Sequence, residues 1–429
     1  MHSIAEQLNE TLKGTIIEGL LSDLGKRFYF PKGIVAQTSE AKKLATKYNA
    51  TAGMAYDHGQ PMHLSAIRRY LPDLEPEEIF AYSTTSGEPI LRELWQKEMI
   101  RKNPSLEGKN ISMPLVVSGL THGISLAADL FADPGDVLVL PELFWGNYRL
   151  IFEGRRQAKI ATFPFFNKRE GLNITGLQET IESQRSGKVI ILLNFPNNPT
   201  GYSPSIKEVK QMVKLLDELA RDSLKLIVIT DDAYFGLFYE WDIFTESLFG
   251  HLASLNKNIL AIKVDGTTKE DLTWGFRIGF LTFGSKDLSS DHYEALERKT
   301  MGLIRSTTSN ASRLAQSLLI KALQSETYQK EKEKSLDLMK QKYLKVKEIL
   351  SRTPLPPNLS VFPFNSGYFM CFEVKGGGAE SLRQKLLHEE GVGTIAVDQH
   401  LLRVAFSYID LEDMEDFYGT ILRAAEKLG

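Results

Sequence analysis

The feature that most constrains this chain is an alternation of short apolar segments with amphipathic ones, which begins near residue 115. The apolar segments are rich in Val, Ile and Leu, as in DVLVLP, KVIILLNFP and LKLIVITDD. Between them lie segments such as SIKEVKQMVKLLDELARD, whose apolar residues recur at helical spacing. Short buried strands that alternate with amphipathic helices are typical of a mainly parallel sheet covered by helices on both faces. We therefore expect an α/β fold.

The rest of the chain predicts a second, smaller domain. After about residue 287 the pattern is almost entirely helical up to the proline-rich TPLPPN, and a strand–helix–strand–helix pattern follows. We expect an N-terminal segment at 1–62 that joins the small domain and a large α/β domain at 63–300. Residues 301–429 would form a long linking helix and a small α+β domain.

Composition narrows the class of protein. The 429 residues contain 51 Lys and Arg against 54 Asp and Glu, a formal net charge of −3 that gives no reason to expect a nucleic-acid partner. No apolar stretch approaches the roughly 18 residues of a membrane span, and the N-terminus lacks the pattern of a secretion signal. Cys371 is the single cysteine, which excludes an intrachain disulfide and a cysteine-cluster metal site. We expect a cytoplasmic protein without a metal.

Several residues that can carry chemistry follow the apolar segments. KVIILLNFP leads into NNPTG with Asn198, LKLIVITDD ends at Asp231 shortly before Tyr234, and DVLVLPELFWGN ends near Trp145. LVVSGL places Gly119 at the start of a predicted helix, where free N–H groups can bind an anion. Each feature has an ordinary alternative: a common turn, a helix cap, a core tryptophan or a capping glycine.

The segment VDGTTKEDLTWGFRIG lies between two apolar segments and adds Lys269 and Arg277. The loops after parallel strands meet at one edge of the sheet, so these side chains should lie together. One kind of ligand uses the whole set: a flat, phosphorylated pyridine that carries an aldehyde. A lysine amine can form a Schiff base with the aldehyde, and an acid can keep the ring nitrogen protonated. The rival lysine, Lys263, lies inside a strand and lacks the arginine eight residues later.

Taken in order, these motifs resemble those of the class I/II aminotransferases, a family of pyridoxal-phosphate-dependent enzymes of fold type I that includes aspartate aminotransferases. The resemblance runs from about residue 52 to the end and rests on NPTG, DDAY, FWGN, SGLTHG and TTKEDLTWGFRIG. It implies a fold type I transferase with pyridoxal 5′-phosphate as cofactor. Its substrates would be two small molecules, an amino acid and a 2-oxo acid.

The resemblance also implies roles for individual residues. Lys269 would form the Schiff base and carry protons, and Asp231 would pair with the ring nitrogen. Tyr234 and Asn198 would donate to the ring hydroxyl oxygen, with Trp145 stacked on the ring. The remaining residues implied for cofactor binding, mostly at the phosphate, are Gly119, Leu120, Thr121, Thr267, Arg277 and Tyr82.

Three less specific matches to the family add further residues to the predicted site. DHGQP and LLRVAFS suggest that Gly59 and Arg403 meet the substrate, together with Asn198. AYSTTSGEPILRELW suggests that Tyr82 reaches the phosphate of a neighbouring subunit, which implies a homodimer with shared active sites.

The sequence also departs from the family pattern. Gly266 stands where many members carry a phosphate-binding serine, so Thr267 or Thr268 would supply the hydroxyl. The SGLTHG segment, which would bind the phosphate, has Leu120 where a small polar residue is common. Backbone N–H groups would therefore contribute more to phosphate binding there.

The expected activity is transfer of an amino group between an L-amino acid and a 2-oxo acid through Lys269. A lyase or synthase with the same cofactor is an alternative, and a non-catalytic regulator is a weaker one. The substrate side chain stays open. A second cation for a distal carboxylate could come from Arg68, Arg69 or Arg305, whereas the aromatic KRFYFPKG segment could close over an apolar side chain.

Overall fold

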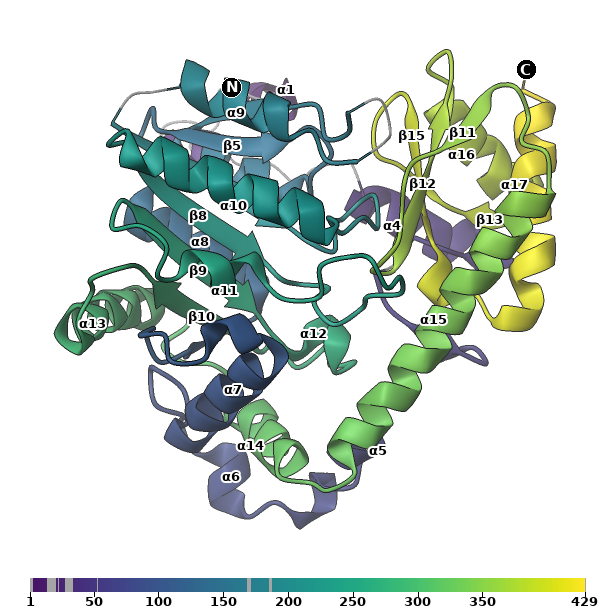
Figure 1. Cartoon of the computed structure of the whole chain (residues 1–429). Coiled ribbons are helices and arrows are strands. Elements are labelled where there is room, and N and C mark those ends of the chain that lie inside the picture. The colour runs from purple at the N-terminus through teal and green to yellow at the C-terminus, as the bar shows by residue number, and fades with distance from the viewer. Residues whose placement is uncertain are drawn as a thin grey trace.

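The structure, a computed structural model, describes residues 3–13, 21, 23–27, 34–51, 53–167, 171–184 and 187–428. A large part is built around a seven-stranded sheet and a smaller part around a four-stranded sheet. The long helix α15 (Tyr328–Arg352) runs from one part to the other (Figure 1). Most of the KRFYFPKG segment lies outside the described residues.

The large sheet is mostly parallel. Its strands lie in the order β4-β10-β9-β8-β7-β5-β6, and only the two pairs that involve β10 are antiparallel. The strands are β4 (Leu115–Val117), β5 (Val137–Pro141), β6 (Lys159–Phe163), β7 (Lys188–Asn194), β8 (Lys225–Asp231), β9 (Ile259–Asp265) and β10 (Gly279–Gly284). The expected mainly parallel α/β sheet is therefore confirmed.

Helices cover both faces of this sheet. Along β7, Ile190 and Leu192 pack in the same apolar core as α8 (Leu120–Phe131). The intervening Ile191 packs in a second core together with α10 (Ile206–Arg221), which crosses the front of the sheet in Figure 1. Because successive side chains of a strand point to opposite faces, a strand covered on both sides is apolar throughout. This explains the unbroken apolar runs in the sequence.

Further helices complete the large part. They are α5 (Ser65–Arg68), α6 (Pro76–Phe80), α7 (Pro89–Lys102), α9 (Ile174–Ser183), α11 (Leu248–Leu252), α12 (Thr267–Glu270), α13 (Ser290–Thr307) and α14 (Arg313–Leu323). The boundary that we expect at residue 300 falls inside α13.

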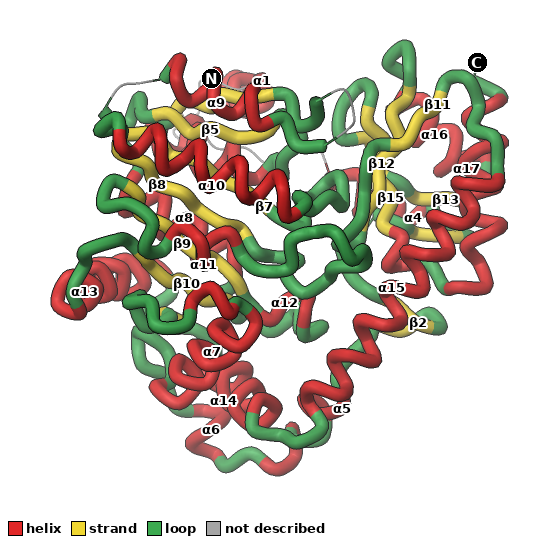
Figure 2. Tube along the Cα trace, in the orientation of Figure 1, coloured by secondary structure: helices red, strands yellow, loops and turns green. Residues whose placement is uncertain are grey.

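The small part is an antiparallel sheet in the order β11-β12-β15-β14, packed by helices. Its elements are β11 (Leu359–Val361), β12 (Phe369–Val374), α16 (Ala379–Glu389), β13 (Val392–Gly393), β14 (Ile395–Ala396), β15 (Leu401–Ala405) and α17 (Met414–Glu426). The main-chain path in Figure 2 shows loops between the ends of the large sheet and this part.

The N-terminal segment contacts both parts. It contains α1 (Ser3–Leu12), α3 (Asp23–Arg27), α4 (Ile34–Leu44), β1 (Tyr48–Asn49) and the hairpin of β2 (Tyr56–Asp57) and β3 (Gln60–Pro61). Arg27 donates a hydrogen bond to the carbonyl of Gly154 in the large part at 3.1 Å. In the small part, β1 pairs in parallel with β13.

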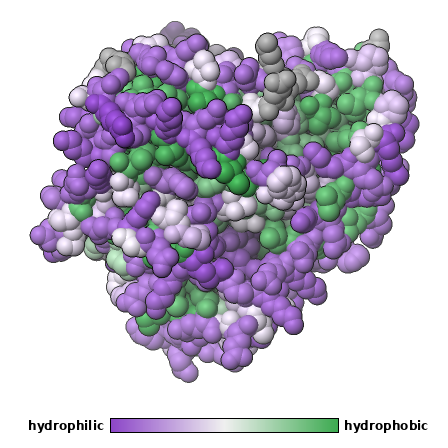
Figure 3. Space-filling view, viewed as in Figure 1, coloured by the Kyte–Doolittle hydropathy of each residue, from purple (hydrophilic) through white to green (hydrophobic). Residues whose placement is uncertain are grey.

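The face of the molecule in Figure 3 is largely hydrophilic, with apolar patches between polar side chains. Among the described residues, no helix is both long and apolar enough to span a bilayer.

Candidate active site

A cavity of about 600 Å³ lies where loops at the ends of the large sheet meet the small part. Most of the residues that the sequence predicts for the site line it together. These are Leu120, Thr121, Trp145, Asn198, Asp231, Tyr234, Lys269, Arg277 and Arg403. Because they come from strands and helices far apart in the chain, the fold gathers the predicted motifs into one pocket.

Lys269 lies in α12, the short helix that follows β9. Its Nζ is 5.0 Å from the centre of the Tyr234 ring, and its carbonyl accepts a hydrogen bond from the Tyr368 hydroxyl at 3.0 Å. Burial lowers the pKa of Lys269 to about 8, with Asp231 opposing and Arg277 reinforcing that shift. An amine with this pKa is partly neutral near pH 7–8, as a nucleophile or proton carrier must be.

Asp231 lies at the end of β8 and faces the pocket. Its carboxylate accepts hydrogen bonds from the Tyr148 hydroxyl at 2.5 Å and from the Ala233 N–H at 3.1 Å. Burial raises its pKa to about 6, while Tyr148 and Lys269 act in the opposite direction. A buried carboxylate of this kind has a strong preference for a cationic partner in the pocket.

Tyr148 is a site residue that sequence reasoning missed. It is fully buried, lines the pocket and donates to Asp231. The only signal for it was its place in FWGNY, shortly after Trp145.

The Arg277 guanidinium lies against the start of α8. Gly119 has φ of +84°, and a Cβ at that position would be 2.4 Å from Nη2 of Arg277. Only glycine allows this approach, because a side chain would displace the guanidinium. The pocket therefore has the Arg277 cation beside the N–H groups at the start of α8, an arrangement suited to binding an anion.

The structure explains the glycine at position 266. A Cβ there would lie 2.8 Å from the Cα of Gly279 and from the carbonyl oxygen of Ile278, so no side chain fits without movement. Thr268 lines the pocket instead, and its Oγ1 is buried without a hydrogen-bond partner among the described residues. Thr267 lies outside the lining, and its hydroxyl accepts a hydrogen bond from Thr273 at 2.8 Å. The geometry favours Thr268 over the Thr267 that we expected.

Arg403 connects three segments at the pocket. It lies in β15, donates to Asn198 Oδ1 and to the carbonyl of Thr51, both at 2.9 Å, and stacks 4.3 Å from the centre of the Phe369 ring. Its Nε has no partner among the described residues. A buried guanidinium with a free donor can still bind an incoming carboxylate.

Gly59 and Tyr82, like Thr267 and Gly119, do not line this pocket. Gly59 is exposed in the turn of the β2–β3 hairpin, and a Cβ there would meet nothing within 4 Å. The glycine that approaches the site is Gly53, where a Cβ would lie 3.1 Å from the Tyr234 hydroxyl. Tyr82 is 92% exposed and lies between α6 and α7.

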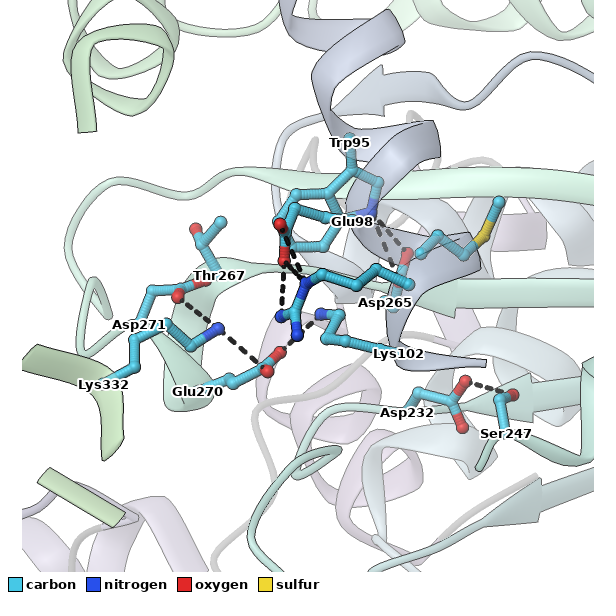
Figure 4. Close-up of polar contacts among 12 residues, drawn as sticks. Trp95, Glu98, Lys102, Asp232, Ser247, Asp265, Thr267, Glu270, Asp271 and Lys332 are labelled. Carbon is cyan, nitrogen blue, oxygen red and sulfur yellow. Dashed lines mark hydrogen bonds and ion pairs between the residues drawn. The ribbon is translucent and has the colours of Figure 1, made fainter. Parts of the chain in front are cut away.

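A largely buried charge cluster holds Glu270 and Asp271, the two residues that follow Lys269 in the sequence (Figure 4). Glu270 forms ion pairs with Lys102 at 2.8 Å and Lys332 at 2.9 Å, and Lys332 also pairs with Asp271 at 2.9 Å. Although burial opposes its charge, the two lysines hold the pKa of Glu270 at about 2. Because Lys102 ends α7 and Lys332 lies near the start of α15, these pairs connect α12 to both helices.

Comparison with known proteins agrees with this architecture. The model of the family described as aminotransferase class I and II matches residues 51–421. Cytoplasmic aspartate aminotransferase isozyme 2 of Arabidopsis thaliana is 25% identical over 195 residues, 44% of this chain and 47% of the relative. Tyrosine aminotransferase of Dictyostelium discoideum is 24% identical over 221 residues, 51% of this chain and 48% of the relative. The matches thus span about half the length of these curated relatives.

Solved structures resemble this chain over nearly all of its length. An aminotransferase from Anaerococcus prevotii DSM 20548 superposes with a TM-score of 0.81 at 23% identity, covering 95% of this chain and 98% of the other. Aspartate aminotransferase from Thermus thermophilus with maleate gives 0.72 at 17% identity, covering 94% and 99%. These likenesses show the fold, fold type I, and the family match covers most of the sequence. The chain belongs to the class I and II aminotransferase family.

Proposed function

We propose that this protein is a pyridoxal-phosphate-dependent aminotransferase that moves an amino group between an L-amino acid and a 2-oxo acid. The observation that carries the proposal is the shared pocket of Lys269, Asp231 and Arg403. These residues supply an amine of lowered pKa, a buried carboxylate and a buried guanidinium. We further propose that the protein acts in the cytoplasm.

The pocket fits the cofactor that this family uses. The unpartnered hydroxyl of Thr268, the Arg277 guanidinium and the start of α8 would hold the phosphate. Asp231, oriented by Tyr148, would hold the ring nitrogen, with Tyr234 and Asn198 beside the ring hydroxyl and Trp145 along the ring. When bound, pyridoxal phosphate supplies an aldehyde that takes up the amino group and a ring that accepts electrons.

The chain's own residues bind the substrate and move its proton. Arg403 would grip the α-carboxylate with two parallel hydrogen bonds, as a planar guanidinium can. Lys269 Nζ would then accept the proton from the substrate Cα, because its lowered pKa leaves it partly neutral at working pH. Asp231 would stay charged opposite the ring nitrogen of the cofactor and would keep that nitrogen protonated.

We also propose a homodimer with shared sites. Tyr82 and Phe80 are 92% and 82% exposed, and both lie in the α6–α7 region at the lower edge of the large part in Figure 1. Large apolar side chains so exposed suit a protein interface. In this arrangement Tyr82 would reach the cofactor phosphate of the partner subunit.

The test is a panel of L-amino acids with cofactor-loaded protein, with and without an added 2-oxo acid. If the protein is an aminotransferase, each site should form one molecule of 2-oxo acid product when no acceptor is present. With an added 2-oxo acid acceptor, the product should form continuously. Continuous release of ammonia without an acceptor would instead identify an elimination enzyme. No product from any donor would contradict catalysis.

A further inference from the structure

The pocket contains one cation to which the proposed mechanism gives no task. Its lining carries Lys42, Lys269, Arg277 and Arg403 against a single carboxylate, that of Asp231. Arg277 is assigned to the phosphate, Arg403 to the α-carboxylate and Lys269 to the proton. The side chain of Lys42 has no ion pair or hydrogen bond within the part of the chain that the structure describes.

Lys42 belongs to a helix that packs on the small part, the part that also carries Arg403. This helix is α4, where Gln37 exchanges two hydrogen bonds of 2.9 Å with the backbone of Ala396. The neighbouring Ile395 pairs directly with Arg403 across β14 and β15. The helix that carries Lys42 is therefore fixed against β14, the neighbour of the strand that carries Arg403, whereas Arg277 belongs to the large part.

Further contacts fix α4 to the small part. Glu40 forms an ion pair of 2.9 Å with Arg383, and Ala41 is buried against Gly393. Thr38 lies one turn before Lys42 and also lines the pocket, as expected for side chains four residues apart on a helix. Lys42 thus projects into the pocket from a supported helix, although its ammonium group stays accessible to solvent.

The cations that we expect from the sequence for a distal carboxylate are placed elsewhere. Arg69 pairs with Glu331 at 2.7 Å, and Arg305 donates to Ser309 on the surface. Neither these two nor Arg68 lines the pocket. Among the described residues, Lys42 is the lining cation available for a second negative charge.

We propose that Lys42 determines side-chain specificity by pairing with a carboxylate at the far end of the substrate, so that the preferred donors and acceptors are dicarboxylic. This inference rests on the proposed aminotransferase function. The two carboxylates of a dicarboxylic substrate would pair with the positive charges of Arg403 and Lys42. A substrate with a neutral side chain would leave the Lys42 ammonium unpaired. Because Lys42 is solvent-accessible, the preference is moderate, about fivefold.

Binding of non-reacting acids tests this without any transfer. Glutarate and pentanoate have the same five-carbon chain and differ by one carboxylate, so the ratio of their Kd values isolates the second charge. Calorimetry on the cofactor-loaded protein is expected to give about fivefold tighter binding of glutarate. In Lys42→Ala the ratio should fall below twofold, and in Lys42→Glu glutarate should bind more weakly than pentanoate.

The matched control is Lys43→Ala, because Lys43 is the next residue of α4, is exposed and does not line the pocket. It should keep the parent ratio. A parent ratio below twofold, undetectable glutarate binding, or an unchanged ratio in Lys42→Ala would each overturn the proposal.

Kinetics with L-glutamate and L-norvaline separate this inference from the proposed function. If transfer occurs, the kcat/KM ratio of the two donors should change about fivefold in Lys42→Ala, chiefly through KM. If no donor reacts but the glutarate preference depends on Lys42, the proposed function fails and the assignment of Lys42 stands. If transfer occurs but the kcat/KM ratio of the two donors does not depend on Lys42, the proposed function stands and the assignment of Lys42 fails.

Discussion

Lys263 and Lys269 are close in the sequence and both are enclosed by the protein, yet their surroundings are opposite. Lys263 is 1% exposed and pairs with two carboxylates, Asp232 and, at 3.4 Å, Asp265. Burial works against its charge, but the two acids outweigh it and raise its pKa. Lys269 faces the pocket. Asp231 raises its pKa, but burial outweighs this effect and lowers the pKa to about 8.

The two neighbouring acids at the end of β8 also differ in their surroundings. Asp231 faces the pocket, whereas Asp232 faces Lys263 and accepts a hydrogen bond from Ser247 at 2.6 Å. This division follows from the alternation of side chains along an extended chain. Burial alone therefore does not make a lysine reactive: the number of acids paired with it decides whether the amine is fixed as a cation or available as a base.

The largest expected effect is the loss of transfer in Lys269→Ala. Removing the amine removes both the nucleophile and the proton carrier, so kcat should fall by about a thousandfold or more. Steady-state kinetics measures this, and circular dichroism checks that the fold is kept. Activity within tenfold of the parent would show that another group moves the proton.

Lys263→Met is expected to affect stability instead. The methionine keeps the volume of the side chain but leaves two buried carboxylates without a cation, which typically costs about 3–5 kcal/mol of unfolding free energy. Urea denaturation of the parent and the variant measures this difference. A cost below about 1 kcal/mol, or loss of the bound cofactor in a protein that is still folded, would break the distinction between the two lysines.

Substitutions of the neighbouring acids Asp231 and Asp232 should likewise affect activity in one case and stability in the other. Asp231→Asn should reduce kcat by about a hundredfold, because a fixed charge that stabilises the reacting ring is lost, while the cofactor still binds. Asp232→Asn should lower stability and leave the activity of the folded protein within about threefold. If the activity of Asp231→Asn stayed within threefold, Asp231 would be structural or Asp232 would take its role.

The smallest effect concerns the pKa of Lys269. In cofactor-free protein, labelling of this amine by acetic anhydride, followed peptide by peptide, should rise with pH around a midpoint near 8. Since Asp231 raises the pKa of Lys269, Asp231→Asn should move the midpoint to lower pH. Lys263 should stay unlabelled over this range. A midpoint that moves upward would contradict the assigned electrostatics.

Much of the large part could be predicted from the sequence, because its strands are covered on both faces and therefore appear as continuous apolar runs. The loops after β7, β8 and β9 could be predicted to meet for the same reason: parallel strands end at one edge. Asn198, Asp231 and Lys269 accordingly line one pocket as expected.

The residues that could not be predicted depend on how distant segments dock. The DHGQP segment predicts Gly59 at the site, yet the docking of the N-terminal segment brings Gly53 to Tyr234 and leaves Gly59 exposed. Tyr148 and Lys42 enter the pocket through packing contacts that leave no local pattern. Asp265 follows Lys263 by two residues in β9, but only the register of the sheet shows that Asp232, one residue after β8, also reaches Lys263.

The most direct test is to find which lysine reacts with the cofactor aldehyde. The parent protein is loaded with pyridoxal phosphate, reduced with borohydride, digested and mapped by mass spectrometry. The reduced adduct is expected on the peptide that contains Lys269, in about one copy per chain, with Lys263 unmodified. An adduct on Lys263, or one spread over several surface lysines without enrichment at Lys269, would contradict the assignment of the site.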